Sequence, residues 1–244
     1  MSKDLEEKLQ EVTRRLNTTK EEFDKFAFSI GHDLRAPLTH IMGFLQLLEE
    51  RISDDLEDKA QEYFKIIKDS TLRLGAMLDA LLTYSRLART EIKMVQVNLD
   101  NLVKETLMRV QKKTTHRTIQ WTIAKLPSVT GDPTLLKKAL ENLIDNAIKF
   151  TAHSEHAQVE IGVEQPQENQ WIIFVRDNGA GFDDTRKSKL FGLFQRLHAQ
   201  TEFEGLGVGL AMVRKIMHMH GGEADATSMV GKGATFYLHM PITQ

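Results

Sequence analysis

The strongest constraint on the fold of this 244-residue chain is a heptad repeat near its start. Residues spaced alternately by four and three positions form a seam at Leu5, Leu9, Val12, Leu16, Thr19, Phe23, Phe26 and Ile30. This spacing places them on one side of a helix and is typical of a coiled coil. A four-residue step then shifts the register, and a second seam follows at Leu34, Leu38, Ile41, Leu45, Leu48 and Ile52. The pattern predicts one long helix that carries two seams.

A second helical stripe follows a polar connection around Ser53 to Asp55, at Ala60, Tyr63, Ile67, Leu74, Met77, Leu81 and Tyr84. Two helices with apolar faces this wide cannot bury both faces in one hairpin. We therefore expect an antiparallel hairpin that pairs with a second copy as a dimeric four-helix bundle. His32 belongs to neither seam, and its ring is expected to face solvent.

Beyond Glu91, runs typical of strands alternate with runs typical of helices. Strands are expected at 93–99, 118–123 and 172–175, and helices at 100–112 and 133–150. The expected fold class is α+β, with the helical hairpin followed by an α/β sandwich whose mixed sheet carries helices on one face. We divide the chain into a coiled coil at 1–27, a helical domain at 28–90 and an α/β domain at 91–244.

Three glycines at alternate positions, Gly205, Gly207 and Gly209, precede Leu210 and an apolar-periodic helix at 211–220. Backbone without β-carbons can approach a polyanion closely, and the free N–H groups at a helix start attract phosphate. The alternative is a flexible linker that leads into a C-terminal helix.

A second glycine cluster follows the expected strand 172–175, in the run Asp177-Asn178-Gly179-Ala180-Gly181. A carboxylate at the end of a strand can accept a hydrogen bond from an exocyclic amine such as that of adenine. The alternative is a hairpin turn, for which Asp-Asn-Gly is also suitable.

The expected helix 133–150 begins with Asp132 as its N-cap and Pro133 in its first turn. Asn142 and Asn146 lie one turn apart on it, and Lys149 follows. Amide oxygens can hold Mg²⁺ or its waters, and a lysine can neutralise phosphate. The alternative is an ordinary solvated polar face.

These motifs together resemble sensor histidine kinases. The run ENLIDNAIKF (141–150), DNGAGFD (177–183), KLFGLF (189–194) with its pair Phe191 and Phe194, and GLGVGLA (205–211) are similar to the N, G1, F and G2 boxes, in the family's order. The resemblance implies an ATP-binding domain of the GHKL type, shared with type II topoisomerases and Hsp90 chaperones. It also implies nucleotide contacts at the positions named above, with Mg²⁺ at Asn146 and Asn142. The stretch 183–204 has few strand or helix signals except around 191–197, and we expect it to form a mobile lid over the nucleotide.

The segment SIGHDLRAPL (29–38) is similar to the family's phosphoacceptor box. The resemblance implies that His32 accepts the γ-phosphoryl group of ATP and passes it to an aspartate of a response regulator. Imidazole is largely neutral near pH 7 and offers a lone pair, Asp33 can act as general base, and Arg35 can neutralise the incoming phosphate. Many relatives carry Thr or Asn where this chain has Ala36, and a methyl group cannot orient water, so weak phosphatase activity is expected.

The run FGLFQRLH (191–198) with EFEGLGVGLA (202–211) is most similar to kinases attached to phytochrome and PAS sensors. A sensor in the same chain or in a separate one is therefore an expected partner. A net charge of −2 argues against nucleic acid as a ligand, and no apolar run has the length of a membrane span. The absence of cysteine fits a cytoplasmic protein. Two alternatives remain: a GHKL-type ATPase, and a degenerate kinase that serves as a dimeric binding module.

Overall fold

The computed structural model describes residues 2–52, 58–87, 90–111, 117–167, 169–199 and 202–242. The chain separates into two compact units, Met1–Thr90 and Glu91–Gln244. Each unit is described below by itself.

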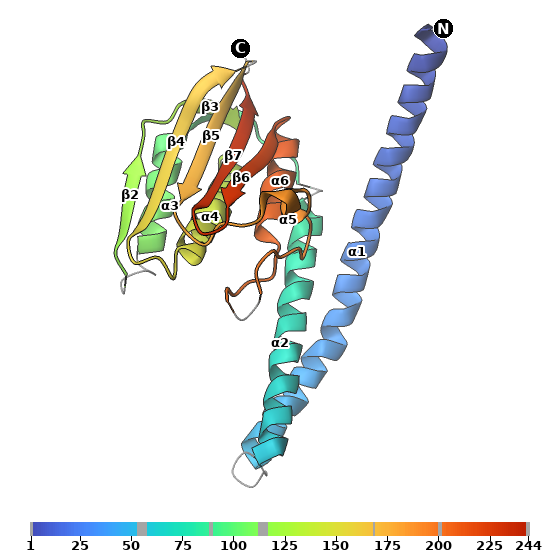
Figure 1. Cartoon of the computed structure of the whole chain (residues 1–244). Coiled ribbons are helices and arrows are strands. Elements are labelled where there is room, and N and C mark those ends of the chain that lie inside the picture. Colours follow the sequence, from blue (N-terminus) through green and yellow to red (C-terminus); the bar gives the residue numbers. More distant parts are fainter. Residues whose placement is uncertain are drawn as a thin grey trace. The chain divides into compact units, whose positions relative to one another are not determined.

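The first unit consists of two helices, α1 (Ser2–Ile52) and α2 (Asp58–Leu87), which pack against each other as an antiparallel hairpin (Figure 1). Helix α1 is the longer of the two, extends past the end of α2 and runs through Pro37. In the described part of the chain, neither these helices nor any others are long and apolar enough to cross a membrane.

The hairpin covers only part of its apolar surface. Leu38 and Leu45 of the second seam are buried against α2, whereas Leu34, Ile41 and Leu48 of the same seam are 44–48% exposed. The stripe expected on α2 was not the buried face: none of its seven residues is buried, and Tyr63, Ile67 and Leu74 are 49–62% exposed. The apolar residues that α2 buries include Leu78 and Leu82 instead. Most side chains of the first seam lie outside the described residues.

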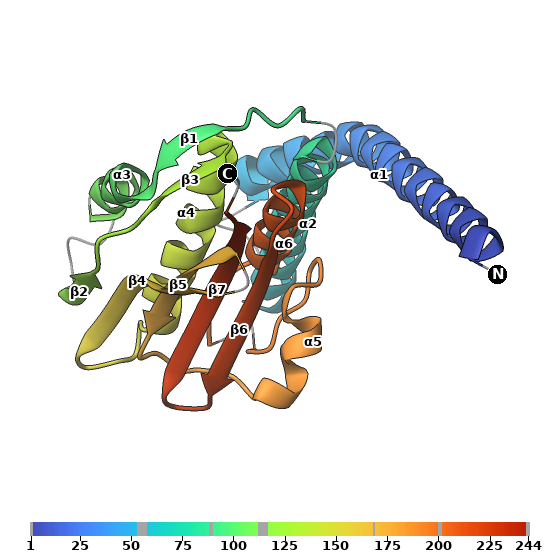
Figure 2. The ribbon, with the colours of Figure 1, turned by 90° about the horizontal axis from the view of Figure 1, so that it is seen from above.

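The second unit contains a five-stranded mixed sheet in the order β2-β4-β5-β7-β6 (Figure 2). Its strands are β2 (Ile119–Ile123), β4 (Ala157–Gln167), β5 (Gln170–Asp177), β6 (Glu223–Met229) and β7 (Gly233–Pro241). Strands β2 and β4 are parallel, and the other neighbours are antiparallel. A separate two-stranded antiparallel ribbon joins β1 (Val95–Asn98) to β3 (Ser128–Gly131).

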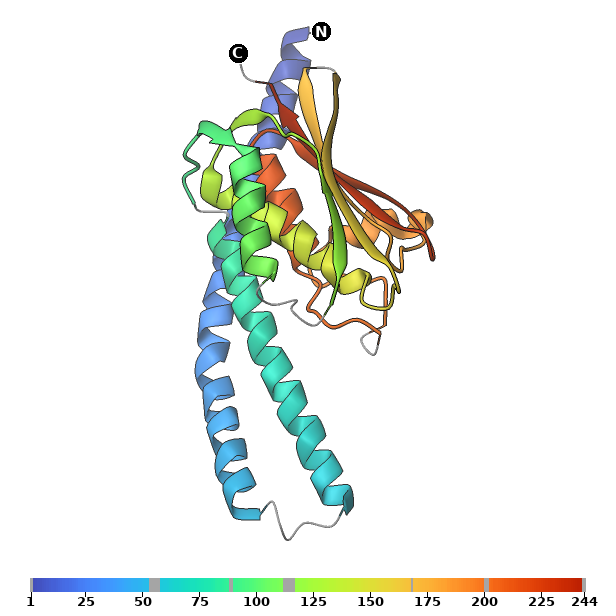
Figure 3. The ribbon, with the colours of Figure 1, turned by 90° about the vertical axis from the view of Figure 1, so that its left-hand side faces the viewer.

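Three helices cover one face of this sheet, as Figure 3 shows: α3 (Leu99–Gln111), α4 (Pro133–Phe150) and α6 (Gly209–Met219). The core lies between the two layers. The apolar face of α4, with Leu140, Leu143 and Ile144 at 0–2% exposure, packs with Val213, Ile216 and Met217 of α6. Alternate residues of the central strands, such as Ile173 and Val175 of β5, complete the core from the sheet side.

The expected fold class is confirmed, since the helical region is followed by an α/β domain with a mixed sheet. The segment 183–204 was expected to hold regular structure only around 191–197, and this was wrong. A short helical stretch, η1 (Asp184–Arg186) and α5 (Lys187–Leu190), precedes Phe191 instead. Asp183 explains its start, because this side chain accepts from Thr185 N at 3.0 Å and caps the turn.

Candidate functional site

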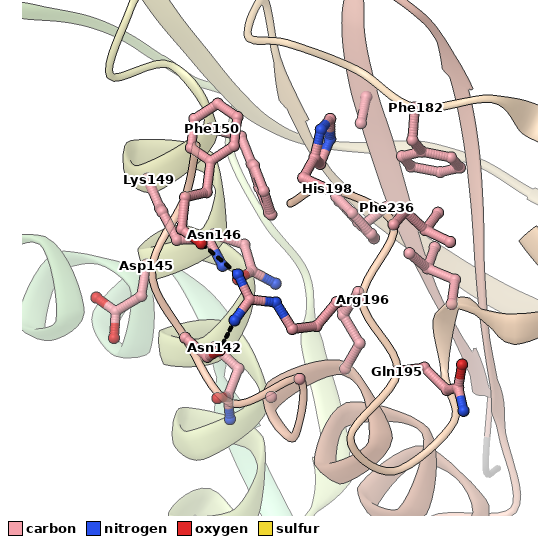
Figure 4. Close-up of a pocket in the computed structure, with 18 of the residues that line it drawn as sticks. Asn142, Asp145, Asn146, Lys149, Phe150, Phe182, Gln195, Arg196, His198 and Phe236 are labelled. Atoms are coloured by element: carbon pink, nitrogen blue, oxygen red, sulfur yellow. Dashed lines mark hydrogen bonds between the residues drawn. The ribbon is translucent and has the colours of Figure 1, made fainter. Parts of the chain in front are cut away.

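A cavity of about 350 Å³ lies in the second unit between α4, the loop after β5, the segment 190–198 and the glycine loop that precedes α6 (Figure 4). Its apolar wall includes Phe182, Leu206 and Phe236, and its polar groups include Asn142, Asn146, Lys149 and Asp177. A largely apolar cleft with a few convergent polar groups is typical of a small-molecule site.

The start of α4 is fixed by Asp132, as the sequence predicted. Its Oδ1 accepts from Thr134 N and Leu135 N at 2.9 and 3.0 Å, and its Oδ2 accepts from Lys93 N at 3.0 Å. The backbone N–H of Asp132 in turn donates to Nε2 of buried His220, at the end of α6, at 2.9 Å. This junction joins the two helices that frame the cavity.

The polar face of α4 lines the cavity. The side-chain amide nitrogen of Asn142 donates to Lys138 O at 2.8 Å, and Oδ1 of Asn142 lies beside Gly209. Lys149 lies about two turns nearer the end of the helix, with Nζ 4.1 Å from the centroid of the Phe150 ring. The face is therefore not simply solvated, because the glycine loop covers part of it.

The glycine loop passes between α4 and the segment 194–196. Gly207 has φ +72°, a backbone region that favours glycine, and a β-carbon there would lie 2.5 Å from Gln195 O. Gly205 lies beside Nζ of Lys149, and Gly209 begins α6. The loop is thus packed on both sides and is not a flexible linker.

Asp177 lies at the end of β5 and is 4% exposed. Its Oδ1 accepts from Gly179 N at 2.9 Å, whereas its Oδ2 is buried without a hydrogen-bond partner among the described residues. Burial raises the pKa of this carboxyl to about 6, although the Gly179 and Ala234 N–H groups partly oppose the shift. A buried acceptor left unpaired inside a cavity fits a ligand that supplies an N–H donor.

The loop after Asp177 is not a hairpin turn. The side chain of Asn178 accepts from Gln158 N and donates to His156 O, so it holds the start of β4. Ala180 N donates to Phe150 O at 3.0 Å, and Ala180 O accepts from Gly231 N at 2.7 Å. These bonds hold the loop between α4 and the β6–β7 turn.

A second cation lies near Lys149 in the cavity. The guanidinium of Arg196 donates to Phe203 O and Gly205 O and points toward α4 (Figure 4). Burial lowers the pKa of Lys149, and the nearby positive charge of Arg196 lowers it further. Two close cations in one cavity indicate a place for a multiply charged ligand.

Aromatic side chains close the cavity at the end of α4. The ring of Phe203 lies 5.0 Å from that of Phe150, 5.1 Å from that of His198 and 5.4 Å from that of His153, between centroids. Sequence reasoning missed Phe203, His198 and Phe236 as lining residues, since nothing in their local pattern separates them from core residues. Their place in the cavity depends on contacts between distant segments.

Of the other residues expected to bind the cofactor, only some line the cavity. Gly181 and Leu210 line the cavity. The N–H group of Gly179 donates to Asp177 from beside the cavity. Phe191 is buried and Phe194 takes a positive φ of 60°, and neither is among the lining residues.

In the first unit, residue 32 lies within α1, and the side chain of His32 is outside the described residues. The next residue, Asp33, is exposed. Arg35 forms an ion pair with Asp79 of α2, in which both side chains are at least half exposed. The expectation that the His32 ring faces solvent is therefore untested.

Two family models match the chain. The His Kinase A (phospho-acceptor) domain matches residues 24–90, and the histidine kinase-, DNA gyrase B- and HSP90-like ATPase matches residues 131–244. Cyanobacterial phytochrome A of Nostoc sp. is 33% identical over 97% of this chain and 31% of its own length. The methanogenesis regulatory histidine kinase FilI of Methanothrix harundinacea is 33% identical over 96% of this chain and 26% of its own length. The chain thus spans about a third or less of these relatives.

Solved structures share the fold. Full-length ShkA in complex with AMPPNP matches with a TM-score of 0.63 and 23% identity, over 89% of this chain and 45% of ShkA. The histidine kinase ThkA in complex with the response regulator protein TrrA matches with a TM-score of 0.62 and 22% identity, over 93% of this chain and 66% of the matched one.

Proposed function

Because this chain belongs to the histidine kinase family, we propose that it transfers the γ-phosphoryl group of ATP to His32 and then to an aspartate of a response regulator. The observation that carries the proposal is the cavity of the second unit, where an unpaired buried carboxylate and two cations converge. The same chain holds a histidine inside its phospho-acceptor segment.

The cavity residues divide between the two ends of ATP. Asp177 accepts the hydrogen bond of the adenine amine at its unpaired Oδ2, with Gly179 and Gly181 shaping the loop beside the ring. Lys149 and Arg196 neutralise the phosphates, which the loop at Gly205, Gly207 and Gly209 surrounds with Leu210 at its end. Phe191 and Phe194 support the lid from outside the cavity.

The amide oxygen of Asn146 would hold Mg²⁺ beside the phosphates, with Asn142 as a second ligand. Among the described residues, no group of three or more His, Cys, Asp or Glu side chains is placed to hold a metal ion. Phosphate oxygens and water would supply its other ligands, as is common for Mg²⁺. When bound, it offsets the charge that develops on the phosphates.

At His32, an imidazole nitrogen attacks the γ-phosphorus, the bond to the β,γ-bridging oxygen breaks, and ADP leaves. Asp33 accepts the ring proton. Arg35 is held by Asp79, but an exposed ion pair contributes only about 0–1 kcal/mol. A phosphoryl group on His32 can therefore compete for Arg35. In the second step, a carboxylate oxygen of the regulator attacks phosphorus and the P–N bond breaks.

A second copy of the chain covers the exposed seam residues of α1 and α2 in a four-helix bundle, with residues 1–27 as a coiled coil and 28–90 as the phosphotransfer domain. The exposure of Leu34, Ile41 and Leu48 in one copy supports this assembly, because such a stripe in water is unfavourable. Residues 91–244 form the catalytic domain. A sensor domain supplies the input, and the reaction takes place in the cytoplasm, where ATP and regulators are present.

The test is incubation of the chain with γ-labelled ATP and Mg²⁺. We expect a label on the protein that is labile in acid and stable in alkali, and that is absent from His32→Ala. The matched control is Asp177→Asn, which keeps His32 and removes the adenine acceptor. ATP hydrolysis without a protein-bound label would favour the ATPase alternative. Nucleotide binding with neither hydrolysis nor a label would favour the binding module.

A further inference from the structure

The two helices of the hairpin approach each other closely beside His32, through two reciprocal glycine–leucine contacts. Gly31 of α1 faces Leu82 of α2, and Gly75 of α2 faces Leu38 of α1. One heptad separates the glycine from the leucine on each helix. Because the helices are antiparallel, the glycine of each helix lies opposite the leucine of the other.

The contact at Gly31 is the tighter of the two. A β-carbon at residue 31 would lie 2.8 Å from Cδ2 and 2.9 Å from Cγ of Leu82, whose side chain is 2% exposed. A β-carbon at residue 75 would lie 3.2 Å from Cδ2 of Leu38, which a small shift can relieve. Glycine weakens a helix interior relative to alanine, so close approach is the physical reason for a glycine here.

The Arg35–Asp79 ion pair lies between these contacts along both helices. Three successive contacts, at residues 31, 35 and 38 of α1, thus face α2 over about two turns of helix. Such a set fixes the rotation of α1 about its own axis. Residue 32 follows Gly31 directly and falls about 100° around the helix from it, away from the line of contact with α2.

We propose that Gly31 and Leu82 are positioning residues for phosphorylation: their contact sets the rotation of α1 at the phosphoacceptor. This inference rests on the proposed function of His32. An added methyl group at residue 31 must push α2 away or rotate α1. Either change displaces the imidazole relative to the γ-phosphate, and phosphoryl transfer is sensitive to displacements of about 1 Å.

The test compares three glycine-to-alanine variants of the whole chain. Gly31→Ala is expected to lower the initial rate of His32 phosphorylation at saturating ATP by at least about tenfold, and Gly75→Ala by about two- to threefold. Gly43→Ala is the matched control: it lies in the same helix, and a β-carbon there meets nothing within 4 Å. It should keep the rate of the natural chain. Affinity for ATP should stay unchanged in all three.

A rescue separates positioning from a general loss of stability. Leu82→Ala removes the three side-chain atoms that an alanine at residue 31 would meet, while it also weakens the hairpin core. In the Gly31→Ala background it should restore at least half of the natural rate, even though the double variant melts at or below the temperature of Gly31→Ala. If Gly31→Ala acted only by lowering stability, the double variant would be phosphorylated more slowly than Gly31→Ala.

The outcomes are distinct. Equal rates for Gly31→Ala and Gly43→Ala, or failure of Leu82→Ala to restore the rate, would overturn this inference and leave the proposed function intact. Absence of any histidine-bound label on the natural chain would instead overturn the proposed function.

Discussion

Replacing Asp177 by asparagine should stabilise the second unit while it destroys nucleotide binding. The carboxylate is almost fully buried, and its Oδ2 has no partner in the described structure. An asparagine of the same shape keeps an oxygen to accept from Gly179 N and puts a neutral amide in place of the unpaired charge. The same amide presents N–H donors where the adenine amine needs an acceptor, so binding should be lost.

The size of the gain follows from the pKa of the carboxyl, which is raised from 3.8 to about 6. Each pKa unit corresponds to about 1.4 kcal/mol, so the charged form is disfavoured by roughly 2 to 3 kcal/mol. Between these two pKa values the folded state retains a proton that the unfolded state releases. The stability of the natural chain therefore falls as pH rises from about 4 to about 6 and stays lower above that.

Both tryptophans, Trp121 and Trp171, lie in the second unit, so their fluorescence follows its unfolding by urea. Asp177→Asn should exceed the natural chain by roughly 2 kcal/mol or more at pH 7.5, and by much less near pH 4.5. The nucleotide arm is a titration with a fluorescent ATP analogue. Asp177→Ala is the control, because it removes the charge but leaves a cavity and an unpaired Gly179 N–H.

The reasoning fails if Asp177→Asn is no more stable than the natural chain at pH 7.5, or if its advantage is equal at both pH values. Retained binding of the ATP analogue would refute the assignment of Asp177 to adenine.

Three further predictions concern phosphate recognition and dephosphorylation. Lys149→Met should weaken the binding of ATP by about tenfold or more and that of adenosine hardly at all, because it removes one of two cations beside the glycine loop. Calorimetric titration of both ligands measures the difference. Gly207→Ala should abolish ATP binding while the second unit stays folded by tryptophan fluorescence, since its β-carbon meets Gln195 O at 2.5 Å and its φ is positive. Ala36→Thr should raise dephosphorylation of the partner regulator above the weak level expected of the natural chain, because a hydroxyl can orient water; an unchanged rate of phosphate release would count against this.

The sequence predicted features that depend on neighbouring residues. The N-cap at Asp132 and the extent of α4 were correct because capping and helical periodicity act over a few positions. The order of the four motifs identified the family, since each motif reflects a local backbone requirement. The short helix before Phe191 was missed because a single turn has no periodicity to detect.

The heptad seams determined that α1 is long and that the first unit is helical, and the glycine spacing predicted the loop proposed to bind phosphate. Only the tertiary structure decided which half of the second seam is covered, that Asp177 is buried with an unpaired oxygen, and that Arg196 lies near Lys149. It also brought Gly31 against Leu82. These properties depend on contacts between segments far apart in the chain, and periodicity and propensity carry no information about such distances.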